Sequence, residues 1–558
     1  MLLRFLFVTF LIPLVHSDQR AFVFDEERGL LPSQNPTKSF WLDTPGANPL
    51  ALEGSDGPLT RDADVCIVGS GMTGVSAAWH LQDLLKDSAA KMKIVILEAR
   101  EFCSGATGRN GGHLTPNLFS TFRARQALYG TAEALKSSLI ETYTSERLVN
   151  FIKERNATQK VDLYNGGVVT LVQTADEEAA LRKDFASASS AGVDLRHVRW
   201  LENKDLVTKY QLDSRLNYTA VKTPAHNLWP CKLVTELFID AVESSTRSNI
   251  SITLHTKTQV TSISRLGTSA LTCSAYSHQR LPRHTRCNKK SQPGNSQTHD
   301  RKWALHTPRG PVTCAYVLHA SNAYAGHLLP FFKGRSKLQV SSYNPAVALV
   351  NQSSNSLSEA PHDFGIIPTR GQVILVPSKV PLSSFPWLNA WSGGGGHWEY
   401  FFPRFQHIAS PNDQAPFVVL GGGRQHAGTN FEGGISDDSR INTQVGKALR
   451  RFLGTLFDGL FDSGQGSRDL VKMEWTGIMG FTKNGDPYVG PVLRPESSNR
   501  DNEFEGQYIA AGYTGHGMVR AYACAEALAS MIASKIKQTE WTAPEWLPER
   551  YLNWNRHL

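Results

Sequence analysis

The chain has 558 residues and a mass of 61.6 kDa, which is too long for one simple core and predicts two large, interleaved domains. Its 41% hydrophobic and 19% charged residues are typical of a globular protein and exclude global disorder. The net charge of +8 would permit acidic partners, but seven Lys/Arg residues lie in one Pro-, Gly- and Ser-containing segment, 280–302. We interpret this segment as a solvated insertion and expect no nucleic-acid binding, because interleaved aromatic residues are missing.

The N-terminus is typical of a targeting segment. Arg4 precedes an apolar run over 5–15, and small residues permit cleavage after Ser17. We therefore predict a signal peptide over 1–17 and a secreted protein, with a cytoplasmic protein as the alternative. Glycosylation sequons compatible with secretion stand at Asn156, Asn217, Asn249 and Asn351. The apolar run is too short for a membrane span, and no later stretch approaches eighteen apolar residues.

A nucleotide-binding pattern follows a Pro- and Gly-rich arm predicted over 18–60. The apolar strand 65–68 breaks into Gly-x-Gly-x-x-Gly over 69–74, and a helix follows. The glycines permit a tight turn, close approach of backbone amides to a pyrophosphate, and close packing of the helix on the strand. A second apolar strand, 94–97, ends in Glu98, whose carboxylate can bind a ribose hydroxyl. This order predicts an adenine dinucleotide site, supported by the partial positive charge of the helix N-terminus.

Two further glycine-rich turns complete the predicted site. The first, over 104–112, has polar side chains that we expect to extend the pyrophosphate cradle. The second, over 512–517, lies between the strand 507–511 and the helix 519–536, so that another helix N-terminus is aimed at the cofactor. Between them, helices are predicted at 132–152, 176–191, 230–241 and 442–456, strands at 166–172, 251–255, 258–263 and 316–324, and an antiparallel sheet over 338–475.

The sequence Glu98-Ala99-Arg100, the Ser-Gly-Ala-Thr-Gly-Arg-Asn-Gly-Gly loop over 104–112 and the Gly-His-Gly-Met turn over 515–518 together resemble a known family. This is the FAD-dependent amino acid and amine oxidase family of D-amino acid oxidase, glycine oxidase and sarcosine oxidase, and the loop is closest to gamma-glutamylputrescine oxidase. The resemblance spans about 60–535. It implies an α/β protein in which a Rossmann-like FAD-binding domain interleaves with an α+β substrate domain built on an antiparallel sheet.

The resemblance assigns boundaries and a cofactor. We predict the FAD-binding domain over 61–155, 225–335 and 475–540, the substrate domain over 156–224 and 336–474, a basic insertion at about 274–302 and a C-terminal tail over 541–558. FAD is expected to be non-covalent, because Arg109 stands where a flavin-linking His would align. The predicted cofactor-binding residues are Gly69, Ser70, Gly71, Met72, Thr73, Gly74, Glu98, Ala99, Arg100, Ser104, Thr107, Gly108, Arg109, Asn110, Gly111, Gly112, Val260, Ala320, Gly480, Gly512, Gly515, His516, Gly517 and Met518.

The implied reaction is oxidation of a C–N bond by hydride transfer to flavin N5, followed by imine hydrolysis and reoxidation by O₂ to give H₂O₂. Met479 stands where amino acid oxidases of the family carry an Arg that binds the substrate carboxylate, which favours an amine substrate. Arg404 or Arg424 could bind a carboxylate instead. His113, Tyr400 and His516 are the candidate catalytic residues.

Three alternatives to an amine oxidase stay open at this point. They are an oxidase of D-amino or N-methyl amino acids, a dehydrogenase with another electron acceptor, and a flavin-binding protein without turnover. The sequence does not identify the amine or the oligomeric state. It has no His/Cys cluster with metal spacing, so no metal is predicted. We expect Cys66 and Cys524 to be small buried hydrophobic residues, and leave open whether Cys273 and Cys287 pair.

Overall fold

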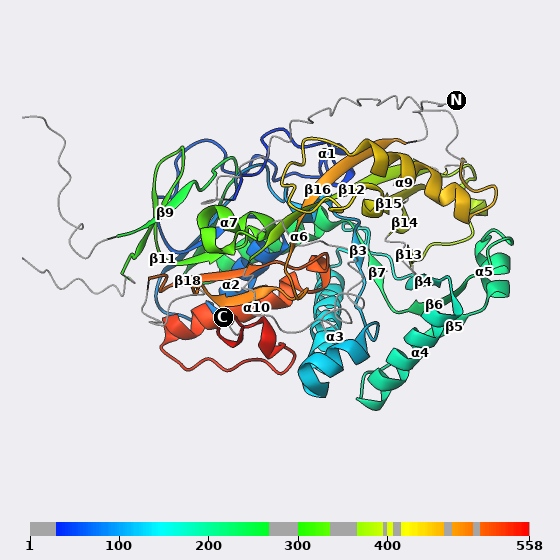
Figure 1. Ribbon diagram of the computed structural model, residues 1–558. Helices are drawn as coiled ribbons and strands as arrows, with labels where there is room; N and C mark the ends of the chain where they lie inside the picture. The colour runs from blue at the N-terminus through cyan, green and yellow to red at the C-terminus, as the bar shows by residue number, and fades with distance from the viewer. Residues whose placement is uncertain are drawn as a thin grey trace, which may run out of the picture.

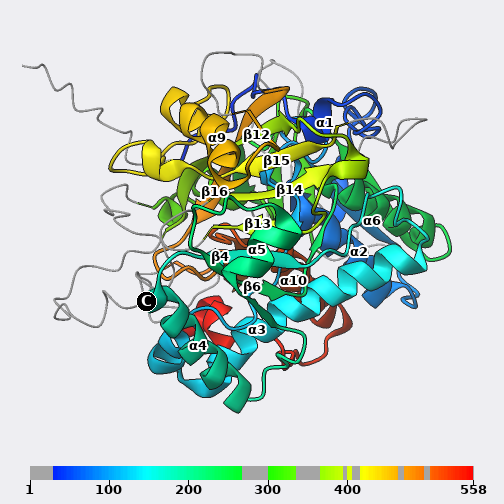
Figure 2. The ribbon, with the colours of Figure 1, turned by 90° about the vertical axis from the view of Figure 1, so that its right-hand side faces the viewer.

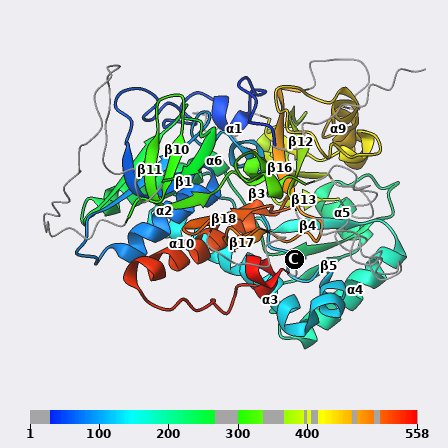
Figure 3. The ribbon, with the colours of Figure 1, turned by 60° about the vertical axis from the view of Figure 1, so that its left-hand side comes forward.

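The computed structural model describes residues 29–266, 300–334, 365–393, 399–404, 415–462, 471–494 and 503–556. Two large sheets lie side by side in it, as Figure 3 shows. The first sheet consists of β1 (Asp62–Val68), β2 (Met92–Leu97), β8 (Ile250–His255), β9 (Ser262–Arg265), β10 (Trp303–His306), β11 (Val312–His319), β17 (Tyr488–Pro491) and β18 (Gln507–Ala511). The predicted α/β class is therefore confirmed.

The first sheet is parallel at its centre (Figure 1). Its order is β17-β18-β11-β1-β2-β8, and β10 and β9 extend it from β11. The neighbours from β18 to β8 pair in parallel, whereas β17, β10 and β9 join antiparallel. Val65, Cys66 and Ile67 are fully buried because both faces of β1 are covered, which explains the continuous apolar run in the sequence.

Helices cover one face of this sheet. The helix α2 (Met72–Leu85) begins directly after the glycine pattern and packs on α10 (Ala521–Lys537) and α6 (Pro230–Ser245). Small residues in α10, such as Ala525 and Ala529, are fully buried and allow the close approach of α2. The predicted helices at 230–241 and 519–536 are thus confirmed, with ends shifted by a few residues.

The second sheet is largely antiparallel. It consists of β4 (Val168–Val172), β5 (Arg199–Leu201), β6 (Thr219–Thr223), β12 (Ile367–Pro377), β13 (Ala390–Ser392), β14 (Tyr400–Arg404), β15 (Phe417–Gly421) and β16 (Met473–Phe481). The order is β16-β12-β15-β14-β13-β4-β6-β5, and only the β13–β4 pair is parallel among the described strands. The helix α9 (Thr443–Leu456) closes a core that contains Trp387, Trp391 and Phe401. The predicted antiparallel sheet is confirmed.

One predicted boundary and two predicted strands are wrong in detail. β16 was assigned to the FAD-binding domain from residue 475, but it pairs with β12 from Ile367↔Phe481 to Leu375↔Met473 and belongs to the second sheet. The strand predicted at 258–263 begins only at Ser262, and that predicted at 316–324 ends at His319. In both places the backbone leaves the sheet to line a cavity, where strand pairing stops.

The helix α3 (Phe122–Glu154) connects the two halves, running diagonally across the view of Figure 2. It is longer than the predicted 132–152 and is kinked at Gly130, whose φ of +80° lies outside the helical region. α3 contacts α10 on one side and α4 (Ala175–Ser190) on the other. Residues of α3 can therefore reach both the nucleotide-binding half and the second sheet.

The described part of the predicted arm, 29–60, is an integral part of the fold. It forms α1 (Phe40–Asp43), and the Trp41 side chain is fully buried. The Trp41 indole N–H donates to the carbonyl of Asn110 at 2.6 Å, and the Ser39 hydroxyl donates to the carbonyl of Gly108 at 2.7 Å. The segment thus fixes the glycine-rich loop that follows β2, rather than simply lying over the body.

The cysteine prediction is wrong for Cys66, which forms a disulfide with Cys314 between the adjacent strands β1 and β11. Sequence reasoning missed it because 248 residues separate the two cysteines. Cys524 is buried with a free thiol, as expected. Cys273 and Cys287 lie outside the described residues. In the part of the chain that the structure describes, no helix is long and apolar enough to cross a membrane.

Candidate active site

A cavity of about 740 Å³ lies where the two sheets meet, and the three glycine-rich turns of the sequence line it. It extends from Val260 and Glu98, beside the first sheet, to Tyr400 and Met479 on the second. The predicted site residues that line it are Gly69, Gly71, Met72, Thr73, Glu98, Ala99, Arg100, Thr107, Arg109, Asn110, Gly111, His113, Val260, Ala320, Tyr400, Arg424, Met479, Gly480, Gly515, His516, Gly517 and Met518. Ser70, Gly74, Ser104, Gly108, Gly112, Arg404 and Gly512 do not line it.

The turn between β1 and α2 depends on glycine for two different reasons. Gly69 has a φ of +110°, which disfavours residues with a Cβ. A Cβ on Gly74 would lie 1.9 Å from the carbonyl oxygen of Gly69, so a side chain there would separate α2 from β1. The Met72 N–H donates to the Thr107 hydroxyl at 3.0 Å, which joins the start of α2 to the next loop. The N-terminus of α2 therefore faces the cavity with its partial positive charge.

The Glu98 carboxylate is held in a fixed orientation at the end of β2. Its Oε2 accepts hydrogen bonds from the backbone N–H of Ser70 at 2.9 Å and from the Ser70 hydroxyl at 2.8 Å. Its Oε1 accepts from the Arg100 N–H at 2.9 Å. Ser70 thus acts from behind the cavity, while Glu98 presents an anionic acceptor to it.

The guanidinium groups of Arg100 and Arg109 stabilise the loop over 104–112 through buried contacts. Arg100 contacts both carboxylate oxygens of buried Asp438 at 2.9 and 3.0 Å, and Arg109 lies 3.6 Å from the same carboxylate. Both donate to the carbonyl of Ser104, at 2.8 and 3.0 Å. Burial lowers the pKa of Arg109 to about 10 despite the neighbouring Asp438, so it stays charged. The loop that is predicted to extend the pyrophosphate cradle is thus anchored to Asp438, while Thr107, Arg109 and Asn110 line the cavity.

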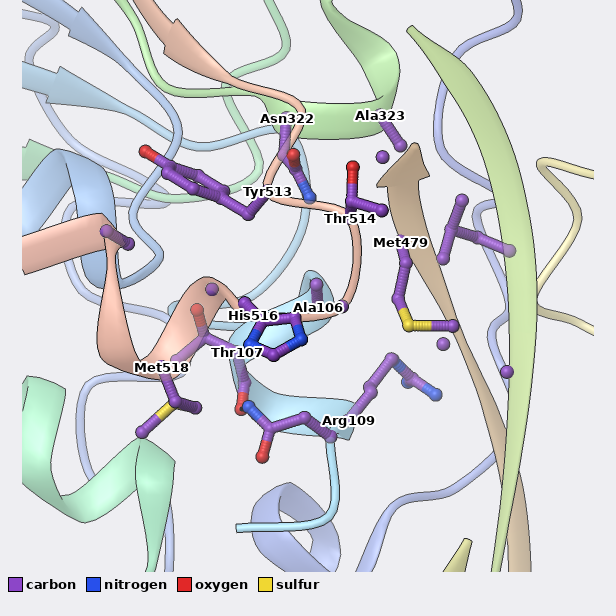
Figure 4. Close-up of a pocket in the computed structure, with 18 of the residues that line it drawn as sticks. Ala106, Thr107, Arg109, Asn322, Ala323, Met479, Tyr513, Thr514, His516 and Met518 are labelled. Atoms are coloured by element: carbon purple, nitrogen blue, oxygen red, sulfur yellow. Dashed lines mark hydrogen bonds between the residues drawn. The ribbon is translucent and has the colours of Figure 1, made fainter. Parts of the chain in front are cut away.

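Hydrogen bonds join the terminal glycine turn to its neighbours on both sides; Figure 4 labels Tyr513 and Thr514 of this turn. The Tyr513 hydroxyl and the Thr73 hydroxyl lie 2.9 Å apart, which joins this turn to α2. The Thr514 N–H donates to the carbonyl of Gly480 at 2.8 Å. The Asn322 side-chain oxygen accepts from the Gly512 N–H at 2.9 Å. Gly512 therefore contributes from outside the cavity, while Thr514, Asn322 and Tyr513 line it.

His516 projects into the cavity from this turn, next to Thr107 in Figure 4. Its Nδ1 lies 3.4 Å from the Oε1 of Glu141, a fully buried carboxylate on α3. The same oxygen pairs with the Arg520 guanidinium at 2.7 Å. Burial alone would raise the pKa of Glu141, but Arg520, His516 and Arg125 outweigh it and lower the pKa to about 2.

Two candidate catalytic side chains meet at the other end of the cavity. The His113 ring, from β3 (His113–Leu114), packs edge-on against Tyr400 at 5.3 Å between centroids. Both ring nitrogens of His113 are buried without a well-formed hydrogen bond to any described residue. Burial lowers the pKa of His113 to about 4 and raises that of Tyr400 to about 12. At neutral pH, His113 is therefore uncharged and Tyr400 keeps its phenolic proton.

Glycines make room for the Tyr400 ring. A Cβ on Gly111 would lie 2.2 Å from the ring, and a Cβ on Gly421 would lie 2.4 Å from it. Gly421 is directly opposite Tyr400 in the β14–β15 pair. The ring position thus depends on two glycines far apart in the sequence, of which only Gly111 was predicted in the site.

The two candidate carboxylate-binding arginines differ in position. Arg424 lines the cavity, and its guanidinium lies 4.9 Å from the Phe481 ring centroid. Arg404 does not line it: its side chain is buried, pairs with Asp162 at 2.7 Å and lies over the Trp41 ring. We therefore drop Arg404 from the predicted substrate pocket.

Comparison with known proteins identifies the fold and the family. The sequence model described as "DAO: FAD dependent oxidoreductase" matches residues 64–531. The chain belongs to the DAO family of FAD-dependent oxidoreductases. The resemblance stated from the sequence and the FAD cofactor are thereby confirmed.

Three known proteins share only part of the chain or only its fold. A gamma-glutamylputrescine oxidoreductase of Escherichia coli is 40% identical over 80 residues, which cover 14% of this chain and 17% of that relative. Glycine oxidase from Geobacillus kaustophilus has a TM-score of 0.52 at 19% identity, covering 87% of this chain and 97% of that structure. L-amino acid deaminase from Proteus vulgaris, with its specific insertion deleted, has a TM-score of 0.55 at 14% identity, covering 92% and 99%.

The residues present fit the cofactor of the DAO family. The N-terminus of α2, with Gly71 and Thr73 at the cavity wall, offers backbone N–H groups to a pyrophosphate. Glu98 offers a fixed carboxylate to the ribose, and Val260 lines the cavity beyond it. No larger group could replace Gly74 without moving the backbone, because its Cβ would meet a carbonyl oxygen. These residues would hold the nucleotide end of FAD.

Sequence reasoning missed Asn322, Tyr513, Glu141 and Gly421. Tyr513 and Asn322 lay within predicted segments, but only neighbouring residues such as Gly512 and Ala320 were predicted as site residues. Glu141 had no local signal, since a single Glu on a predicted helix is usually a solvated residue. Only the packing of α3 against the terminal turn reveals its position.

Proposed function

We propose that this DAO-family protein oxidises the C–N bond of an amine and that O₂ is its electron acceptor. The chemistry that bound FAD supplies is acceptance of a hydride at N5 and return of both electrons to O₂, which gives H₂O₂. The substrate loses the hydride from its carbon and a proton from its nitrogen, which gives an imine, and the hydride and the proton together account for the two hydrogens of H₂O₂. Water then hydrolyses the imine to a carbonyl compound and a free amine or ammonia.

The observation that carries the choice of an amine is the apolar Met479 side chain at the cavity wall. Met479 projects from β16 toward the cavity in Figure 4; it pairs with Thr369 of β12, and a Cβ on Gly371 would lie 3.0 Å from its methyl carbon. A thioether cannot form the paired hydrogen bonds that a guanidinium gives a carboxylate, and an unpaired buried carboxylate is costly. An amine without an α-carboxylate avoids this cost.

The charges around the substrate end support a cationic substrate. Glu399 is buried at the cavity wall, and Glu177 and Asp184 of α4 also line it. Arg424 lines the same cavity, and Arg123 and Arg125 lie near Asp184. The buried Glu399 carboxylate is therefore the group that could bind an ammonium group of the substrate at this end.

His113 and Tyr400 would position the reacting amine. His113 is neutral at neutral pH because burial lowers its pKa to about 4, so it can accept a hydrogen bond from an N–H group. Tyr400 keeps its proton and can donate one. If the amine binds in its neutral form, hydride transfer needs no further base, and both side chains serve to orient the substrate.

A second candidate is oxidation of an amino acid. Arg424 follows β15 and lines the cavity. It could bind a substrate carboxylate in place of the Arg that Met479 replaces. Structures of glycine oxidase and iminodiacetate oxidase share this fold, at 19% and 15% identity. This candidate predicts that Arg424, rather than Glu399, decides substrate choice.

The test is H₂O₂ release by the FAD-loaded protein with polyamines, N-methyl amines, gamma-glutamyl amines, and D- and L-amino acids. We expect turnover with amines and little with amino acids. Met479→Arg should reduce amine turnover at least tenfold and add measurable turnover of an amino acid, whereas Met479→Leu should retain amine preference. Turnover of amino acids alone by the wild-type protein would refute the amine proposal. Flavin bleaching by an amine without H₂O₂ would point to a dehydrogenase.

A further inference from the structure

The α3–α10 interface holds a charged cluster that the proposed substrate chemistry does not use. Glu141 lies at its centre with no exposed side-chain surface, between Arg520 and His516. Of these three residues, only His516 lines the cavity. The cluster thus reaches the cofactor cavity through one imidazole.

We propose that Glu141 is a positioning residue for the flavin: it holds the His516 ring with Nε2 toward the cavity and so helps to set the redox potential of bound FAD. The proposal rests on FAD binding, which follows from membership of the DAO family, and not on the identity of the substrate.

The contacts of Glu141 fix its carboxylate from three sides. Oε1 accepts from the Arg520 Nε at 2.8 Å, and Oε2 accepts from the Asn117 N–H at 2.7 Å. The remaining direction of Oε1 points to His516 Nδ1 at 3.4 Å. A fully buried carboxylate with these partners has no freedom to turn, so it is a rigid acceptor for the imidazole.

The acceptor determines which imidazole atom is available to the cofactor. Because Nδ1–H faces the Glu141 carboxylate at 3.4 Å, Nε2 is the ring atom left to face the cavity. The His516 side chain is 33% exposed at the cavity wall, and the contact with Glu141 restrains the orientation of its ring.

Arg520 does not replace His516 at the wall. Its guanidinium is buried, pairs with Glu141 and donates to the carbonyl of Gly485 at 3.0 Å. Arg125 adds a second buried cation near Glu141. Arg520 and Arg125 therefore compensate the Glu141 charge within the interface, and the group that acts on the cavity is the His516 imidazole. With the ring protonated, its Nε2–H would favour reduced flavin, which carries more negative charge than oxidised flavin.

The test is the midpoint potential of the FAD-loaded protein, measured by dye-coupled reduction without substrate. We expect His516→Gln and Glu141→Gln each to shift the equilibrium about tenfold toward oxidised flavin, which for a two-electron couple is a decrease of about 30 mV. In the double variant, Glu141→Gln should change the midpoint potential little beyond the shift caused by His516→Gln, because both residues act through one imidazole. Glu526→Gln is the matched control, since Glu526 is also at the α3–α10 interface and binds Tyr143, away from the cavity.

The direction of the change in midpoint potential distinguishes this proposal from a direct electrostatic effect and from a purely structural role of Glu141. Removing a negative charge by direct electrostatics alone would raise the potential, and equally in both His516 backgrounds. A purely structural role would lower the unfolding temperature and leave the potential unchanged. Either result would overturn the proposal. If Glu141→Gln does not fold, Glu141→Asp keeps the charge for Arg520 but withdraws it from His516, and should lower the potential in the same way. Because no substrate is present, the result is independent of whether the protein oxidises amines.

Discussion

The nucleotide end and the substrate end of the cavity are built in different ways. At the nucleotide end, the wall is mainly backbone: the turn at Gly69, the start of α2 and the fixed Glu98 carboxylate. At the substrate end, single side chains such as Met479 and Tyr400 form the wall. A backbone site needs particular glycines at fixed spacing, whereas a side-chain site needs only suitable neighbours in space. The first kind is readable from residue spacing alone, whereas Met479 and Tyr400 were predicted only through the resemblance to a known family.

The largest effect expected concerns the loop that joins the two ends. Asp438→Asn leaves Arg100 and Arg109 buried without their shared carboxylate, and we expect a loss of about 3–5 kcal/mol in the free energy of unfolding. Asp437→Asn is the control, because its side chain is 44% exposed, and should cost less than about 1 kcal/mol. Chemical denaturation measures both. Equal losses would show that the loop does not depend on the buried ion cluster.

Glu141, whose partner His516 lines the cavity, can be tested through the pH dependence of the unfolding free energy. Its pKa is about 2 in the folded protein and about 4.5 unfolded, so its stabilisation is complete above pH 4.5 and is lost as the pH falls toward 2. We expect Glu141→Gln to lower the unfolding free energy by about 3 kcal/mol at pH 7. The difference from wild type should shrink between pH 4.5 and 2, in denaturation curves recorded across that range. A difference that is constant with pH would contradict the assigned charge.

At the nucleotide end, Gly74→Ala tests the dependence on backbone packing. The added Cβ would meet the Gly69 carbonyl oxygen, and we expect the FAD-free protein to lose about 1–3 kcal/mol in unfolding free energy. Gly105→Ala is the matched control, because a Cβ there meets no atom within 4 Å and the φ is not positive. Wild-type stability of Gly74→Ala would mean that the close contact of α2 and β1 is not required.

At the substrate end, Gly421→Ala should change activity more than stability or FAD binding. The added methyl displaces the Tyr400 ring, and we expect kcat/KM for the best amine to fall about tenfold. FAD affinity, measured by fluorescence titration, should stay within about twofold, since Gly421 does not line the cavity. An equal loss of FAD affinity would show that the two ends are not independent.

The sequence predicted β1, β2 and β18 because each has an apolar run that ends at a glycine or an acid, namely Gly69, Glu98 and Gly512. It did not predict β10 or β17, and the bounds of β9 and β11 were wrong, since these strands lack such an apolar run with a clear end. It predicted the antiparallel nature of the second sheet from alternation. It could not assign β16, since Trp475 to Gly480 precedes the last nucleotide-binding segment along the chain but pairs with β12. The Cys66–Cys314 disulfide and the Glu141–His516 contact were also beyond reach, because each joins residues hundreds of positions apart.

The segment after α10 has a consequence for how this protein is divided. The family match ends at residue 531, yet Leu547 and Tyr551 beyond it are fully buried. Arg550 pairs with Asp486 at 2.9 Å and with Glu133 of α3 at 3.0 Å, and the Tyr551 ring lies 5.9 Å from the Arg520 guanidinium. A domain boundary drawn at the end of the family match would therefore remove packing that supports the Glu141 cluster. Residues outside the family match would thus contribute to the flavin potential that we propose the cluster sets.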